Sequence, residues 1–144
     1  MTKEDKQLLL KDLCARLPYN PIIVNPQLDG GYPYKLSPHS LKTSKYLDSS
    51  YIEDTKIYLR PMSSMTEEEK RDFSIFIGKT VEYRQKICLD SDSMCNPIIG
   101  GFKCVYWGLF DKCIDWLNAH HFDYRGLIPK GLAIAVTEDN NPYK

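Results

Sequence analysis

Residues 51–69, YIEDTKIYLRPMSSMTEEE, carry a strand signal followed at once by a helix signal. Ile57 and Leu59 alternate with less apolar neighbours, which is the period of two expected for a half-buried strand. Pro61 ends this pattern, because a proline has no backbone N–H to donate to a sheet. We therefore predict a strand within residues 51–60.

The helix signal is a capping box. The Thr66 hydroxyl can accept a hydrogen bond from the Glu69 amide, while the Glu69 carboxylate accepts one from the Thr66 amide. The apolar face that follows starts at Phe73 and is short. A helix is predicted to begin at Thr66 and to end between Phe76 and Tyr83.

Two more helices are predicted, one toward each end of the chain. Over residues 2–17, Thr2 provides a cap, and apolar side chains follow the i, i+3, i+4, i+7 spacing of one helix face at Leu10, Leu13, Cys14 and Leu17. The charged side chains off that stripe are predicted to form a solvated face, and they include Lys6, Lys11 and Arg16. Over residues 109–119 the same spacing recurs at Phe110, Cys113, Ile114 and Leu117.

Short strands and turns fill much of the remaining chain. Residues 20–25 are predicted to form a strand rich in β-branched side chains, which the flanking prolines place at a sheet edge. The turn at 29–31 allows residues 32–36 either to pair back as a hairpin or to form a surface loop. Further strands are predicted within 102–107 and at 132–136.

These elements predict a single α+β domain over residues 1–144, with about three helices packed on a short, mostly antiparallel sheet. Residues 37–50 are rich in hydroxyl and lysine side chains and are predicted to form a flexible loop. Residues 140–144 are predicted to fray. The apolar share of 42% and the charged share of 26% are those of an ordinary globular domain.

Charge and hydropathy narrow the classes of function. Lys and Arg number 19 and Asp and Glu number 19, so the formal net charge is zero and nucleic-acid binding is disfavoured. The same lack of net repulsion leaves a homodimer open. Because the chain shows neither a secretory signal nor a membrane span of about 20 apolar residues, we expect a cytoplasmic protein that does not bind membranes.

Metal and cofactor motifs are incomplete. The five cysteines are an odd number without a C-x-x-C pair, so we expect free, buried thiols in a reducing compartment. Asp90 and Asp92 imitate a calcium loop but lack its glycine and its closing glutamate. Gly100 and Gly101 lack the flanking residues of a phosphate loop. We expect neither a metal nor a cofactor.

Three stretches, LCARLPY at 13–19, YLRPMSSMTEEEK at 58–70 and DWLNAHHFDYRGLIPKGLA at 115–133, resemble a family of small uncharacterised proteins from gut anaerobic bacteria and their prophages. The resemblance implies a bacterial or prophage source. It implies no activity, because none is established for the family. Relatives tend to carry a charged residue where this chain has Pro129, which implies a different local backbone after Asp123.

The densest group of chemically capable side chains comprises His120, His121, Asp123, Tyr124 and Arg125. If the helix at 109–119 continued, His121 would extend its buried stripe and His120 would lie beside the Trp116 indole. This structural role is the favoured hypothesis. The alternative is an enzyme in which one histidine is a general base oriented by Asp123, while Arg125 binds an anionic substrate. It requires a concave pocket in which a histidine meets an acid.

Aromatic side chains supply a candidate protein-binding surface. Tyrosine offers a large contact area at low entropic cost, and burial is least assured for the tyrosines of the proline-rich segment, among them Tyr32, Tyr34 and Tyr46. The leading hypothesis is a non-enzymatic accessory or protein-interaction protein, encoded by a prophage. Besides the enzyme, a weak nucleic-acid binder is the alternative, using Lys35, Lys42 and Lys45.

Overall fold

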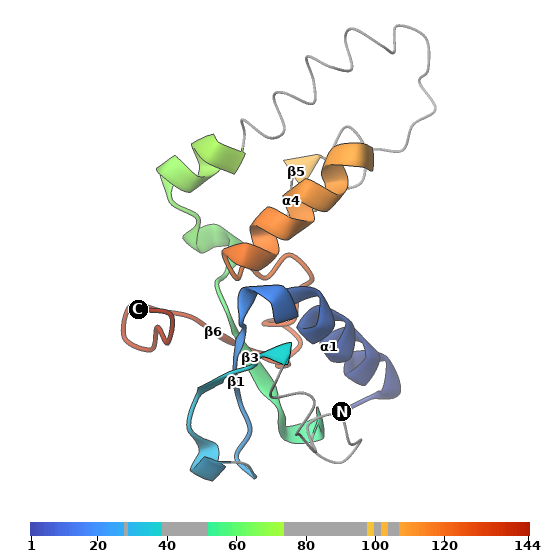
Figure 1. The fold of residues 1–144 in the computed structure, drawn as a ribbon, viewed down its shortest axis with the longest axis vertical. Helices are drawn as coiled ribbons and strands as arrows, with labels where there is room; N and C mark the ends of the chain where they lie inside the picture. Colours follow the sequence, from blue (N-terminus) through green and yellow to red (C-terminus); the bar gives the residue numbers. More distant parts are fainter. Residues whose placement is uncertain (28, 39–51, 74–97, 100–101, 104–106) are drawn as a thin grey trace, which may run out of the picture.

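The computed structural model describes residues 1–27, 29–38, 52–73, 98–99, 102–103 and 107–144 (Figure 1). These residues form α-helices and a four-stranded sheet with the strand order β2-β1-β3-β6. β1 pairs with β2 and with β3 in antiparallel fashion, whereas β3 and β6 are parallel. The predicted fold class, an α+β domain with helices on a short, mostly antiparallel sheet, is confirmed.

Each strand is short, and each of the four in the sheet lies within a segment predicted as a strand or as half of a hairpin, whereas β4 of the separate pair was not predicted. The four strands of the sheet are β1 (Ile22–Val24), β2 (Tyr34–Lys35), β3 (Lys56–Leu59) and β6 (Ala133–Ala135). A separate antiparallel pair consists of β4 (Ile98–Ile99) and β5 (Phe102–Lys103).

The segment that contains β1 differs from expectation in one respect. Residues 32–36 do pair back on it, with Ile23 opposite Tyr34, so the hairpin is confirmed. The predicted edge position is wrong, because β1 lies between β2 and β3. Its prolines flank the strand, so no donor is lost within Ile22–Val24, and the Pro21 carbonyl still accepts a hydrogen bond of 2.8 Å from the Leu36 amide.

Helix α1 (Lys3–Arg16) packs on the sheet (Figure 1). Its predicted cap is confirmed, since the Thr2 hydroxyl accepts a hydrogen bond of 3.1 Å from the Asp5 amide. The predicted stripe is confirmed at Leu13, which is buried, and at Leu10 and Leu17, which are half-buried and pack against the core, but it is wrong at Cys14. The helix buries Leu9, Asp12, Leu13 and Arg16, while Cys14 is exposed.

Two helices form the opposite end of the molecule from the β1–β2 hairpin (Figure 1). One is α4 (Trp107–Ala119), and the other begins at Glu67, with residues 67–73 described. The capping box is confirmed by two hydrogen bonds, from the Glu69 amide to Thr66 Oγ1 at 3.1 Å and from the Thr66 amide to Glu69 Oε2 at 2.8 Å.

The buried apolar side chains form two clusters. The larger lies between α1 and the sheet and includes Leu9, Leu13, Ile23, Ile57, Leu59 and Leu127. The smaller joins the two helices at the other end and comprises Met65, Phe73, Cys113, Leu117 and Phe122. The turn that follows α4 therefore contributes to both clusters, through Phe122 and Leu127.

The C-terminal residues return to the sheet, although the sequence predicts that residues 140–144 fray. The Tyr143 hydroxyl donates to the Tyr58 carbonyl at 2.7 Å and accepts from the Ile22 amide at 3.3 Å. The Tyr143 side chain thus attaches the polar C-terminal segment to the sheet. The predicted flexible loop at 37–50 lies outside the described residues, apart from Ser37 and Pro38. Of the helices described, none is long and apolar enough to cross a bilayer.

Candidate functional site

The inward face of α1 ends in a buried ion pair. Arg16 Nε donates to Asp12 Oδ2 at 2.7 Å, and both side chains are completely buried. The prediction that Arg16 belongs to a solvated face is wrong. Residues four apart lie on the same side of a helix, so Asp12 and Arg16 enter the core together and each compensates the other's charge.

Arg16 also joins α1 to the chain that follows α4. Its Nη2 donates to the Phe122 carbonyl at 2.7 Å. Its guanidinium carbon lies 5.3 Å from the centre of the Tyr124 ring, and that of Arg125 lies 5.0 Å from the same ring. Arg125 Nε is 3.4 Å from Asp12 Oδ1. The structure thus brings the predicted residues Tyr124 and Arg125 together with the buried ion pair.

His120 and His121 follow α4, and their rings stack on different aromatic side chains. His120 stacks on Trp116 with ring centroids 3.8 Å apart, as the spacing predicts, and its Nδ1 donates to the Trp116 carbonyl at 2.8 Å. His121 has a left-handed backbone, with φ of 59°, and stacks on Tyr143 at 3.9 Å. Burial lowers the pKa of His121 from 6.5 to about 4, so this imidazole is neutral near pH 7.

Asp123 holds a turn. Its two carboxylate oxygens accept hydrogen bonds from the Leu127 and Ile128 amides, both at 2.8 Å, and its own amide donates to the Arg60 carbonyl at 2.8 Å. The catalytic hypothesis needs this carboxylate to orient a histidine. The hydrogen bonds described for it go to the backbone, as expected for a buried acid that stabilises a loop.

A second ion pair braces the helix that begins at Glu67. Arg60 donates to both oxygens of Glu69, at 2.7 and 2.9 Å, and its guanidinium carbon lies 4.2 Å from the centre of the Phe122 ring. This pairing, with the hydrogen bond from Thr66, lowers the pKa of Glu69 from 4.5 to about 2. Glu69 therefore serves the helix cap and Arg60 at once.

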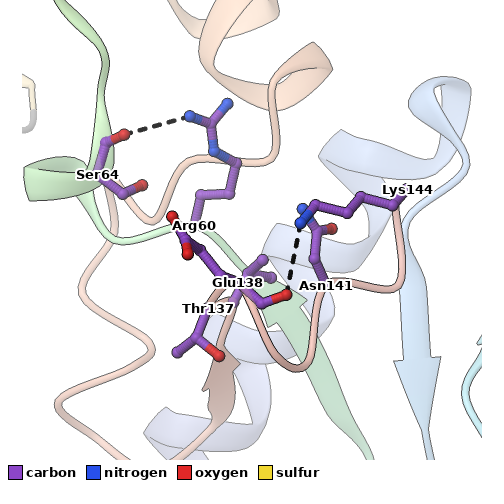
Figure 2. Close-up of a pocket in the computed structure, with 7 residues that line it drawn as sticks. Arg60, Ser64, Thr137, Glu138, Asn141 and Lys144 are labelled. Carbon is purple, nitrogen blue, oxygen red and sulfur yellow. Dashed lines mark hydrogen bonds between the residues drawn. The ribbon is translucent and has the colours of Figure 1, made fainter.

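A hollow of about 350 Å³ lies beside Arg60 (Figure 2). Two hydrogen bonds join its lining residues to one another, from Arg60 Nη2 to the Ser64 carbonyl at 3.4 Å and from Lys144 Nζ to the Glu138 carbonyl at 3.5 Å (Figure 2). The full lining comprises Arg60, Ser64, Val136, Thr137, Glu138, Asn141 and Lys144. Neither histidine lines this hollow, so it does not supply the pocket that the catalytic hypothesis requires.

The tyrosines predicted to form a binding surface have different surroundings. Tyr32 is 74% exposed at the tip of the β1–β2 hairpin. Tyr34 is half-buried and packs against the larger core cluster. Tyr46 lies outside the described residues, as do Lys42 and Lys45 of the nucleic-acid hypothesis, whereas Lys35 is exposed on β2.

Three residues of this region, Asp12, Arg16 and Tyr143, were not predicted as site residues. The i, i+4 spacing of an acid and a base was available as a signal for the first two, but exposed pairs share it. Tyr143 has no local signal, because its partners are distant in sequence. Within the described ranges, no group of three His, Cys, Asp or Glu is placed to hold a metal ion. In comparisons with known proteins, no family model, no curated protein and no solved structure matches the chain.

Proposed function

We propose that this protein binds another protein through the tip of its β1–β2 hairpin and acts as a non-enzymatic accessory. The observation that carries the proposal is the exposure of Tyr32, at 74%, two residues before β2. An exposed tyrosine combines a large apolar surface with a polar hydroxyl, which is the combination enriched at the centres of protein interfaces.

Polar contacts of a buried side chain fix the start of the connection between β1 and β2. Asn25 is buried, and its side chain donates to Thr55 Oγ1 at 2.9 Å and accepts from the Gln27 amide at 2.8 Å. The Tyr32 ring lies over Gly30, since a Cβ built on that glycine would be 3.5 Å from Tyr32 Cε2. A pre-ordered aromatic side chain loses little conformational entropy on binding.

The edge of the sheet favours contact through side chains. β2 is the outer strand on this side and is two residues long, with Pro33 before it and Lys35 within it. Short, charged edges next to proline resist the addition of another strand. The partner is therefore expected to cover Tyr32 together with Pro26 and Pro33, which are also exposed.

We place this interaction in the cytoplasm of a bacterium, with the gene carried by a prophage. The chain's five cysteines support a reducing compartment, and Cys14 is an exposed free thiol. The resemblance of residues 13–19, 58–70 and 115–133 to proteins of gut anaerobic bacteria and their prophages supports this source.

Site-specific photocrosslinking in the native host tests the proposal. A benzophenone amino acid at position 32 should crosslink one defined protein, while the same group at the exposed position 112 on α4 should not. A product of twice the chain's mass would identify a second copy as the partner. Identical products from both positions, or none from position 32, would contradict the proposal.

A further inference from the structure

The pairing of β1 with β3 ends one residue pair earlier than its register would allow. Ile23 pairs with Ile57 and Val24 with Lys56, so the same register places Ile22 opposite Tyr58. In an antiparallel pair, residues with backbone groups turned toward the partner strand recur at every second position. If the two strands stayed together, the Ile22 amide would therefore donate a hydrogen bond directly to the Tyr58 carbonyl.

Beyond Tyr58 the same edge of β3 belongs to another segment. The Arg60 amide donates to the His121 carbonyl at 2.8 Å, and the Arg60 carbonyl accepts from the Asp123 amide at 2.8 Å. This is a parallel bridge between Arg60 and Phe122. The Ile22 amide and the Tyr58 carbonyl therefore lie at a junction, where β1 has left β3 and residues 121–123 begin to pair with it.

The side chain of Tyr143 fills this junction. Its hydroxyl accepts from the Ile22 amide at 3.3 Å and donates to the Tyr58 carbonyl at 2.7 Å, which replaces the missing direct bond. Its ring lies nearly parallel to that of His121, with centroids 3.9 Å apart and an interplanar angle of 13°. One donor, one acceptor and one flat aromatic face thus converge on a single phenol.

We propose that the Ile22 amide, the Tyr58 carbonyl and the His121 ring form a phenol-binding site, which the chain's own Tyr143 occupies. The ligand class is a phenol, either the tyrosine side chain of a peptide or a small free phenol, and it competes with Tyr143 for the same three groups. A ring without a hydroxyl leaves the amide and the carbonyl unpaired, and an alcohol without a ring leaves the His121 face uncovered. This inference does not rest on the proposed interaction at Tyr32.

Among the described hydrogen bonds of residues 140–144, those that reach a distant part of the chain are made by the Tyr143 hydroxyl. The other described polar contacts of this segment stay close to it in the chain, from Asn140 Nδ2 to the Ala135 carbonyl at 3.0 Å and from the Tyr143 amide to Asn141 Oδ1 at 2.9 Å. Residues 137–140 are exposed. Withdrawal of Tyr143 therefore empties the site without requiring the sheet or α4 to unfold.

Binding of p-cresol to Tyr143→Ala tests the proposal. NMR titration should give saturable binding that shifts the Ile22 amide resonance, at least tenfold tighter than binding to the wild type. Toluene, which lacks the hydroxyl, should bind at least tenfold more weakly than p-cresol. The matched variant Tyr19→Ala, which removes a half-buried tyrosine elsewhere, should behave like the wild type. Equal binding of toluene and p-cresol, or no saturable binding, would overturn the proposal.

Two further measurements complete the test. If N-acetyltyrosine amide binds Tyr143→Ala as p-cresol does, the site takes peptide tyrosines, and if only p-cresol binds, it takes small phenols. Should Tyr143→Ala fail to fold, Tyr143→Phe keeps the ring and deletes only the hydroxyl. Hydrogen exchange at the Ile22 amide should then accelerate about fivefold, with the Val24 amide as an internal reference. Unchanged exchange at Ile22 would show that the hydroxyl does not close the junction, and the proposal would fail.

Discussion

The two ends of β1 lead into regions that use functional side chains in opposite ways. Before Ile22, the end of α1 buries Arg16 against Asp12 and ties both to the turn after α4. After Val24, the chain turns through a hairpin tip at which Tyr32 is largely exposed. The first region is dense in charged and aromatic groups that already have partners within the chain. A concentration of reactive residue types therefore does not by itself indicate a site that is open to a ligand.

The severest test of this contrast is Arg16→Met. The variant leaves the Asp12 carboxylate fully buried, with Arg125 at 3.4 Å as its remaining described cation. Removal of one partner of a buried ion pair costs about 3–5 kcal/mol, so the free energy of unfolding should fall by that amount in a urea titration. The double variant Asp12→Leu/Arg16→Met leaves no uncompensated charge in the pair and should recover much of the loss. A double variant as unstable as the single one would show that packing, not charge, governs this region.

Local patterns located most of the helices and strands, because caps, prolines and periodicity act within a few residues. Thr2, Thr66 and the alternation around Ile57 are examples. The sheet order was out of reach, since nothing near Ile22 indicates that β3 covers its far side. The buried face of α1 was misjudged because Arg16 is stabilised by the Phe122 carbonyl, more than one hundred positions along the chain.

The stability of the densely packed region should depend on pH through His121. The pKa of His121 is about 4 in the folded chain, against 6.5 for an ordinary histidine side chain, so between these values the unfolded state binds a proton that the folded state does not. Stability contributed by His121 is therefore complete above pH 6.5 and is lost as the pH falls to about 4, by roughly 1 kcal/mol per pH unit after allowance for solvent screening.

His121→Phe should flatten the urea-unfolding profile over this range, because the ring can still stack on Tyr143 without a group that titrates there. His120→Phe serves as the control and should retain most of the slope, because burial, and not the neighbouring His120, is the largest cause of the lowered pKa of His121. Glu69 does not interfere, since its contribution is lost only as the pH falls from 4.5 toward 2. A His121→Phe profile with the wild-type slope would contradict the assignment.

A smaller effect is expected for Thr66→Ala at the helix cap. The variant removes the acceptor for the Glu69 amide but leaves the ion pair between Glu69 and Arg60, so it should cost about 1 kcal/mol of unfolding free energy in urea. Ser63→Ala, at an exposed position three residues earlier, is the matched control and should lie near the wild type. Equal losses from both substitutions would mean that the cap hydrogen bond contributes little.

The candidate site was only partly predictable, and the reason is physical. Residues 120–125 were singled out by type, and the stacking of His120 on Trp116 follows from helical spacing. Whether Asp123 faces a histidine depends on the path of the chain after α4, and that path turns the carboxylate toward the Leu127 and Ile128 amides. Exposure of Tyr32 and burial of Tyr34 likewise depend on which face of the hairpin meets the core.

The smallest effect on stability is expected for Tyr32→Ser, and it decides whether the hairpin tip is an interaction surface or part of the structure. A side chain that is 74% exposed makes few contacts within the fold, so its replacement should change the free energy of unfolding by less than about 0.5 kcal/mol. The same variant should also lose most of its affinity for the partner protein that crosslinking at position 32 identifies. Tyr34→Ser is the matched control two residues away, and because Tyr34 packs against the core it should lose more than about 1 kcal/mol. If Tyr32→Ser is as destabilised as Tyr34→Ser, or if it retains its partner in full, the tip belongs with the buried region and the comparison between the two ends of β1 fails.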